Sequence, residues 1–248
     1  MFTETGHLSF TSQVTLLNIG ASMQIPIDNQ TSIQIATFVS ELFGQNAYLL
    51  RRTDSNKCVL VDPSFEVDAI FEFLRVNELE PAAILNTHGH IDHIVGNLPI
   101  KERFPDVPLI IGELEAHKLL DPVANLSSGY GIEVVSPPAD LTVSHNEIIK
   151  YGGLELETRL TPGHSPGHVV WVCHQSLVPV VINGDVLFAG SIGRTDFPDG
   201  SSADLETSIR EQLYTLPDET IVLTGHGNVT TIGQEKATNP YVRGKEFS

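Results

Sequence analysis

The segment Thr87–His93 constrains this chain more than any other, because three histidines and one aspartate fall within six residues. It directly follows a short apolar run that is typical of a buried strand. Alternate side chains of an extended segment face one side, so His88 and His90 can bind the same metal ion. A helical turn after them would carry Asp92 and His93 towards a neighbouring position. Imidazole and carboxylate groups suit divalent ions such as zinc, so the segment predicts a metal site.

Further ligands are expected from distant parts of the chain, because four ligands in one turn cannot complete two metal shells. Three candidates each lie beside a glycine and just after a predicted strand: His164, Asp185 and His226. Glycine permits tight turns and close approach of the backbone. A lone loop histidine is more often structural or solvent-exposed, but the joint occurrence of these residues at strand ends favours a shared site.

The charge composition limits the classes of partner that are expected. The formal net charge is −17, from 31 acidic and 14 basic residues. A surface this negative repels phosphate backbones and anionic lipid heads, so neither a nucleic acid nor a membrane is expected as a partner. A small-molecule substrate is expected, and an anionic one stays compatible because a metal ion or local cations can override the global field. The oligomeric state is left open.

A cytoplasmic location is expected. Residues 1–20 lack the basic and apolar regions of a signal peptide, and no stretch approaches the roughly 18 apolar residues that span a bilayer. Cys58 and Cys173 lie in apolar runs and are predicted to be buried small side chains rather than a disulfide. They fit a reducing compartment.

The chain divides into an N-terminal extension, residues 1–30, with a strand near Val14–Ile19, and a single domain, residues 31–248. Apolar runs predict strands at Ile33–Val39, Ala47–Leu50, Cys58–Val61, Ala82–Leu85, Leu109–Ile111, Ile148–Lys150, Leu154–Leu160, Val169–Cys173, Val178–Ile182 and Ile221–Leu223. Helices are predicted at Val67–Leu74, Glu113–Leu120 and Ala203–Leu213, and residues 121–147 are predicted as a long loop. Hairpins with interspersed helices fit two sheets with helices outside them.

The ligand pattern resembles the signature of the metallo-β-lactamase superfamily, from about Phe38 to His226. The resemblance implies an α+β (α/β) fold, the four-layer αββα sandwich, and two divalent metal ions, zinc first, with iron or manganese as alternatives. It assigns His88, His90 and His164 to the first metal, Asp92, His93 and His226 to the second, and Asp185 to a bridge between them. It also implies that Asp62, in Val61-Asp62-Pro63, braces the histidine segment.

Within that superfamily, residues 161–168, 184–188 and 193–197 look most like the glyoxalase II (hydroxyacylglutathione hydrolase) group, in its short bacterial form. This resemblance implies hydrolysis of a thioester such as S-lactoylglutathione by metal-activated hydroxide, with Asp92 as the catalytic residue that orients the nucleophile or accepts its proton. The long form binds glutathione partly through a helical C-terminal domain, which this sequence does not contain after His226.

Other activities use the same ligands. An iron-dependent persulfide dioxygenase would need only two histidines and an aspartate, such as His88, His164 and Asp185. A lactonase or other ester hydrolase would keep both metals. Nucleases of the superfamily are disfavoured by the acidic chain, flavin-partnered di-iron proteins usually carry a glutamate where His90 stands, and a non-catalytic binding module would be expected to lose ligands.

Several residues near the motifs are assigned weaker roles. His168 lies close to His164, and a direct role for it is the less favoured reading. Arg194 and Asp196 fit an ion pair that stabilises a loop as well as they fit substrate contact. Trp171 is predicted in the core, and the remaining histidines are predicted on the surface or in strands: His7, His117, His145 and His174.

Overall fold

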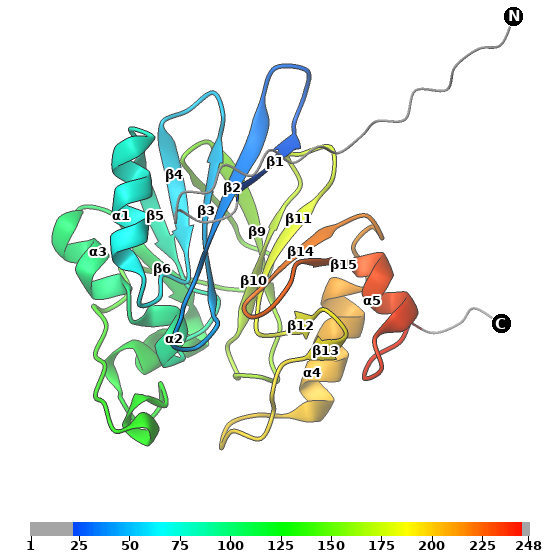
Figure 1. The fold of residues 1–248 in the computed structure, drawn as a ribbon. Coiled ribbons are helices and arrows are strands. Elements are labelled where there is room, and N and C mark those ends of the chain that lie inside the picture. Colours follow the sequence, from blue (N-terminus) through cyan, green and yellow to red (C-terminus); the bar gives the residue numbers. More distant parts are fainter. Residues whose placement is uncertain (1–21, 245–248) are drawn as a thin grey trace, which may run out of the picture.

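The structure is a computed structural model that describes residues 22–244. Two β-sheets pack face to face, and helices cover the outer face of each sheet (Figure 1). The predicted four-layer αββα sandwich is confirmed.

The first sheet has seven strands in chain order: β1 (Ser22–Pro26), β2 (Ser32–Val39), β3 (Asn46–Arg52), β4 (Lys57–Val61), β5 (Glu80–Leu85), β6 (Leu109–Gly112) and β7 (Leu141–Val143). Strands β1 to β4 pair antiparallel, and β4 to β7 pair parallel. Helices α1 (Val67–Val76) and α3 (Asn97–Arg103) lie on its outer side (Figure 1).

The second sheet has six strands in the order β15-β14-β11-β10-β9-β8. Their bounds are β8 (Ile148–Tyr151), β9 (Leu154–Leu160), β10 (Val169–Cys173), β11 (Val180–Gly184), β14 (Ile221–Thr224) and β15 (Thr230–Thr231). Helices α4 (Ser202–Ser208), which continues into the π-helical turn η3 (Ile209–Leu213), and α5 (Ile232–Thr238) cover it. Only β11 and β14 pair parallel in this sheet.

Short elements complete the described chain. They are α2 (Ile91–Ile94), the 3₁₀ helices η1 (Glu113–Leu120) and η2 (Ser127–Tyr130), and the hairpin β12 (Leu187–Phe188) with β13 (Ser191–Ile192).

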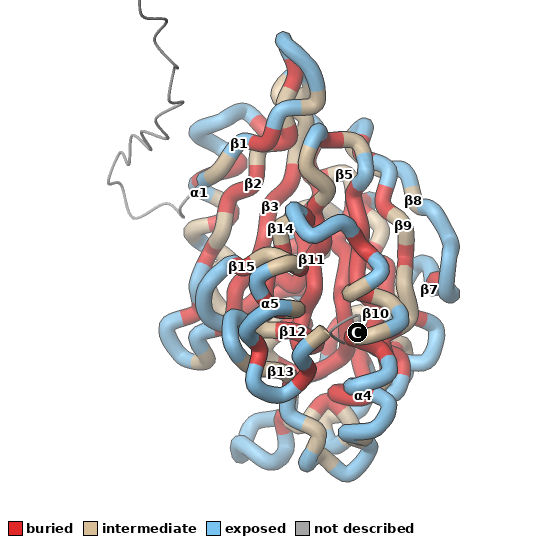
Figure 2. Tube along the Cα trace, turned by 90° about the vertical axis from the view of Figure 1, so that its right-hand side faces the viewer, coloured by how far each residue is buried: buried red, intermediate tan, exposed pale blue. Residues whose placement is uncertain are grey.

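Strand alternation explains the layers. Successive side chains of a strand point to opposite faces, so β10 sends Val169 and Trp171 into the core between the sheets and Val170 and Val172 towards α4. Trp171 is fully buried there, which confirms its predicted place in the core. Figure 2 shows the buried backbone running through the middle of both sheets, with exposed segments at their ends.

The structure differs from the sequence prediction at several elements. Strand β1 lies inside the predicted N-terminal extension, pairs with β2 and buries Ile25, while the predicted strand Val14–Ile19 lies outside the described residues. The predicted loop 121–147 contains η2 and β7. Strand β7 (Leu-Thr-Val) has three residues, which are too few for their alternation to predict a strand.

The structure also bears on the cysteines and on membrane-spanning helices. Cys58 and Cys173 are both buried and free, as predicted. Among residues 22–244, every helix is too short or too polar to cross a bilayer.

Candidate metal centre

The predicted ligands come from four chain segments that follow strand ends. His88 follows β5, His164 follows β9, Asp185 follows β11 and His226 follows β14. Strands β11 and β14 run parallel and hydrogen-bond to each other, so their carboxyl ends share one edge. A backbone hydrogen bond of 2.7 Å from the Asn46 N–H to the Gly225 carbonyl joins that edge to the first sheet.

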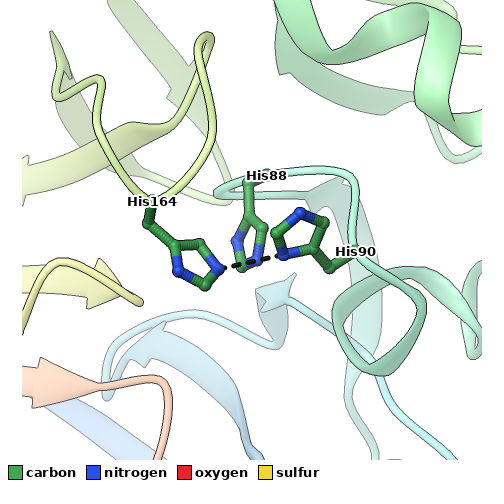
Figure 3. A group of neighbouring side chains, drawn as sticks. All are labelled: His88, His90 and His164. Atoms are coloured by element: carbon green, nitrogen blue, oxygen red, sulfur yellow. Dashed lines mark hydrogen bonds between the residues drawn. The ribbon is translucent and has the colours of Figure 1, made fainter. Parts of the chain in front are cut away.

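One group of possible ligand atoms comprises His88, His90 and His164, all buried, with those atoms within 4.8 Å of one another. The three imidazoles come from two loops and converge (Figure 3). His90 Nδ1 lies 2.9 Å from His164 Nε2. Two nitrogen ligands of one tetrahedral zinc ion lie roughly 3.3 Å apart, so this close approach fits a shared ion.

A second group comprises Asp92, His93 and His226. Asp185 lies between the groups: its Oδ1 is 3.4 Å from His93 Nε2, and its Oδ2 is 3.6 Å from His164 Nε2 and 3.4 Å from His226 Nε2. The structure therefore brings all seven predicted side chains together, with the carboxylate of Asp185 where a bridging ligand would lie. The assignment of each side chain as a ligand stays a prediction.

His93 and His164 form hydrogen bonds through their outer Nδ1 atoms, which turns their Nε2 atoms towards the other predicted ligands. His93 Nδ1 donates to Asp62 Oδ2 at 2.9 Å, and His164 Nδ1 donates to the Arg194 carbonyl at 2.9 Å. In the neutral ring, which a metal ligand must be, each partner fixes the tautomer whose Nε2 keeps its lone pair. Within the described residues, the buried Nε2 atoms of His88 and His93 and the buried Oδ1 of Asp185 have no hydrogen-bond partner. Buried polar atoms without partners are uncommon, so these three fit a site that binds a cation.

Asp62 contacts the histidine segment at three points. It accepts the Thr87 N–H at 2.7 Å, the Thr87 hydroxyl at 2.6 Å and the His93 Nδ1–H at 2.9 Å. Its φ is +49°, an uncommon value for a residue with a side chain. The bracing role implied for Asp62 agrees with these contacts.

His168 contacts the centre without offering a free nitrogen. Its Nε2 accepts the Asp185 N–H at 3.1 Å, and its Nδ1 lies 3.1 Å from the Thr161 hydroxyl. The ring stacks on His88, with centroids 4.8 Å apart. His168 therefore orients Asp185 and His88 and is not part of either ligand group.

Burial and neighbouring charge split the imidazoles into two classes. Burial, followed by nearby histidines, holds the pKa of His88 and of His90 well below the usual range, so both rings are neutral as a ligand requires. Burial also lowers the pKa of His93 and His226, but the carboxylates beside them outweigh it. Asp92 and Asp185 bring the pKa of His93 well above its usual value, and hydrogen bonds to Asp185 and Asp92 bring that of His226 to about 9.

The centre forms the floor of a pocket of about 260 Å³. Aromatic and apolar side chains wall it: Phe43, Ile91, Leu126, Tyr130, Phe188 and Phe197. Arg194 lies at the exposed rim, paired with Asp196 at 2.9 Å and stacked 4.7 Å above the Phe197 ring. The ion pair and the pocket position are thus compatible, although the sequence left them as alternatives.

Sequence reasoning missed other contributors and set aside some histidines correctly. His117, His145 and His174 are exposed, and His7 lies outside the described residues. The aromatic walls come from segments far apart in the chain, so no spacing marked them. Glu115 and Lys118 were also missed, because charged residues in a predicted helix usually face solvent.

Comparison with known proteins shows the family of this chain. Residues 41–226 match the family described as the metallo-beta-lactamase superfamily. The probable metallo-hydrolase YqgX of Bacillus subtilis is 41% identical over 200 residues, which cover 80% of this chain and 92% of that protein. Hydroxyacylglutathione hydrolase GloC of Haemophilus influenzae is 35% identical over 206 residues, covering 82% of this chain and 95% of that protein.

Two solved structures superpose on the fold of this chain. BLEG-1 B3 metallo-beta-lactamase superposes with a TM-score of 0.78 at 35% identity, covering 90% of this chain and 99% of that chain. TTHA1623 in a di-iron-bound form superposes with a TM-score of 0.72 at 31% identity, covering 83% of this chain and 99% of that chain. The sandwich and the family match agree with the histidine–aspartate groups, which form a binuclear metal site of the type found in such proteins. This chain belongs to the metallo-β-lactamase superfamily.

Proposed function

We propose that this chain hydrolyses a thioester, such as S-lactoylglutathione, with two divalent metal ions held by its seven histidine and aspartate side chains. The observation that carries the proposal is the pair of ligand groups around Asp185 at the floor of the pocket. The resemblance to GloC, a hydroxyacylglutathione hydrolase, supports the substrate class. The bound ions would supply an activated water and positive charge beside the carbonyl oxygen.

Asp92 is the proposed catalytic residue. Its Oδ2 lies 3.2 Å from His226 Nε2 and 3.7 Å from His93 Nε2, and the side chain lines the pocket. A carboxylate in this place can orient the attacking water and accept its proton. A thiol has a pKa of about 8.5, so it leaves as thiolate without a dedicated proton donor. A site made of metal ligands and aromatic walls is therefore sufficient for a thioester, whereas an amide would need proton donation to the leaving amine.

The pocket walls suit a small organic acyl group. Phe43 and Tyr130 meet edge to face at 5.2 Å on one side, and Phe197 packs against the His90 and His164 rings at 5.1 and 5.4 Å. Aromatic faces exclude water from the bond that reacts and bury apolar substrate surface. Arg194, at the rim, would meet a carboxylate of the thiol part.

Zinc is the proposed metal, since nitrogen and carboxylate ligands with an open side suit it. A second candidate, an iron-dependent persulfide dioxygenase, is favoured by one feature of the site. His88, His93 and Asp185 also group within 4.8 Å, which is the two-histidine, one-carboxylate set of mononuclear iron oxygenases. In this set His93 takes the place of His164, which the sequence suggested and which groups instead with His88 and His90. The relative TTHA1623 was solved with two irons, so iron suits this fold.

Metal analysis of the purified protein, followed by a substrate panel, tests the proposal. Two metal ions per chain and turnover of S-lactoylglutathione above that of lactones are expected. Asp92→Asn is expected to keep the first metal ion, to bind the second more weakly and to lose most of kcat. Oxygen consumption with glutathione persulfide at one iron per chain would establish the second candidate instead. Preference for lactones would leave the metal centre intact and overturn the thioester assignment.

A further inference from the structure

The 3₁₀ helix η1 buries two opposite charges beside the metal centre. Glu115 is 0% exposed and Lys118 is 1% exposed, and Lys118 Nζ lies 3.6 Å from Glu115 Oε2. Burial of a charged group is unfavourable unless hydrogen bonds compensate for the lost water. The partners of this pair are therefore informative, and all of them except Asp199 belong to the loops that carry predicted ligands.

Glu115 joins two of these loops. Its Oε2 accepts the N–H of Gly89, the residue between His88 and His90, at 2.9 Å. Its Oε1 accepts the Ser165 hydroxyl at 2.5 Å and the Gly167 N–H at 2.9 Å, on the loop that carries His164. One carboxylate thus fixes the distance between the backbones of all three histidines of the first group.

Lys118 adds a third segment. Its Nζ donates to Ser165 Oγ at 2.5 Å and to Asp199 Oδ2 at 2.6 Å. Asp199 belongs to the segment whose Arg194 carbonyl accepts the His164 Nδ1–H. The ammonium therefore ties η1 both to the His164 loop and to the segment that fixes the His164 tautomer.

Close packing against η1 supports the same function. A Cβ on Gly89 would lie 2.6 Å from Lys118 Cβ, and one on Gly167 would lie 2.6 Å from Leu114 Cβ. Such distances leave no room for a side chain at either position. Both glycines let a loop lie directly on the helix, where its backbone N–H reaches Glu115.

We propose that Glu115 and Lys118 are positioning residues for the first metal group, which hold the His88–His90 and His164 loops at the spacing that one divalent ion needs. Neither side chain is proposed to touch metal or substrate. The inference rests on the metal centre of the proposed function and is independent of its substrate.

The buried Glu235 offers a matched control. It is also 0% exposed and accepts three hydrogen bonds, from the Thr230 hydroxyl at 2.5 Å, the Asn239 amide at 2.8 Å and the Gly190 N–H at 2.9 Å. It lies outside both ligand groups and the pocket lining. Loss of its charge should therefore perturb stability in a similar way without acting on the metal.

The test measures metal binding to the full chain by chelator competition and by the visible spectrum of the cobalt-substituted protein. Glu115→Gln and Glu235→Gln are both expected to lower the Tm. Only Glu115→Gln is expected to weaken metal affinity, roughly 10- to 100-fold as for residues that orient metal ligands, and to change the cobalt bands. Equal affinity and unchanged bands in the two variants would overturn the proposal.

Milder variants cover the case in which Glu115→Gln does not fold. Ser165→Ala removes only the hydroxyl between the two charges, and Asp199→Asn weakens the more exposed partner of Lys118. Each is expected to weaken metal binding several-fold, and wild-type affinity in both would overturn the proposal. A wild-type chain that binds no divalent ion would overturn the metal centre together with this inference, whereas normal metal binding without thioester turnover would overturn only the substrate.

Discussion

The polar groups behind the imidazoles decide which ring nitrogen of each histidine is free. Asp62 accepts the Nδ1–H of His93, and the Arg194 carbonyl accepts that of His164. His168 uses its own Nε2 to accept the Asp185 N–H. His168 therefore supports the centre, whereas His93 and His164 turn their Nε2 atoms towards the other predicted ligands.

Asp62→Asn is expected to weaken metal affinity by roughly 10- to 100-fold, because the amide cannot accept from Thr87 and His93 as strongly as the carboxylate. Chelator competition measures the change. Asp54→Asn, at an exposed carboxylate paired with Arg52, should bind metal as the wild type does. If the two variants behaved alike, Asp62 would have no part in orienting the histidines.

Arg194→Gln is expected to raise KM for a glutathione thioester by about 2- to 5-fold and to leave kcat nearly unchanged. The side chain is exposed at the rim, where such ion pairs contribute about 1 kcal/mol or less. The His164 hydrogen bond goes to the Arg194 backbone, so the substitution spares it. Steady-state kinetics with a thioester of an uncharged thiol is the control. An equal rise in KM for both substrates would remove the arginine from thiol recognition.

At the scale of elements, strands with two buried faces could be predicted from the sequence, and supporting elements could not. Continuous apolar runs such as Val169–Cys173 mark central strands, and a glycine beside His164, Asp185 and His226 marks the ends of three strands. Strand β7 was not predicted because it has only three residues, and two of them are exposed to solvent. Helix η1 was expected as a short helix, but nothing in its pattern shows that Glu115 and Lys118 turn inward, since that depends on loops from elsewhere in the chain.

Gly163 fixes the junction between the His164 loop and α4. Its φ is +137°, its carbonyl accepts the Ser201 N–H at 2.7 Å, and a Cβ there would overlap the Leu205 backbone. Gly163→Ala is expected to lower the free energy of unfolding by about 2 kcal/mol or more, through backbone strain and overpacking. Chemical denaturation measures it. Gly129→Ala, where a Cβ meets nothing within 4 Å, should change stability by less than about 0.5 kcal/mol. Equal stability of the two variants would contradict this account.

At the scale of the whole molecule, the burial of the Cys58 thiol makes the free energy of unfolding fall at alkaline pH. Burial raises the pKa of the Cys58 thiol from 9.0 to about 12. The folded state then holds its proton over a range in which the unfolded state releases it. The stabilisation is complete below about pH 9 and is lost as the pH rises towards 12. Urea denaturation across this range should show that the free energy of unfolding falls less steeply with pH in Cys58→Ala than in the wild type. Parallel declines in the two proteins would exclude Cys58 as a source of the pH dependence.

Metal removal should destabilise the whole sandwich, because the ligands come from both sheets and tie their edges together. His88 and His93 follow the first sheet's β5, and Asp185 and His226 follow β11 and β14 of the second. A ligand that binds only the folded state stabilises it by about 2.7 kcal/mol at a hundred times its Kd. For a domain of this size, that raises the Tm by roughly 5–10 °C. Thermal unfolding with saturating zinc and with excess chelator measures the difference. Asp185→Asn, which removes the carboxylate between the two groups, should lose most of the shift; a full shift in that variant would mean that zinc stabilises the protein from another place.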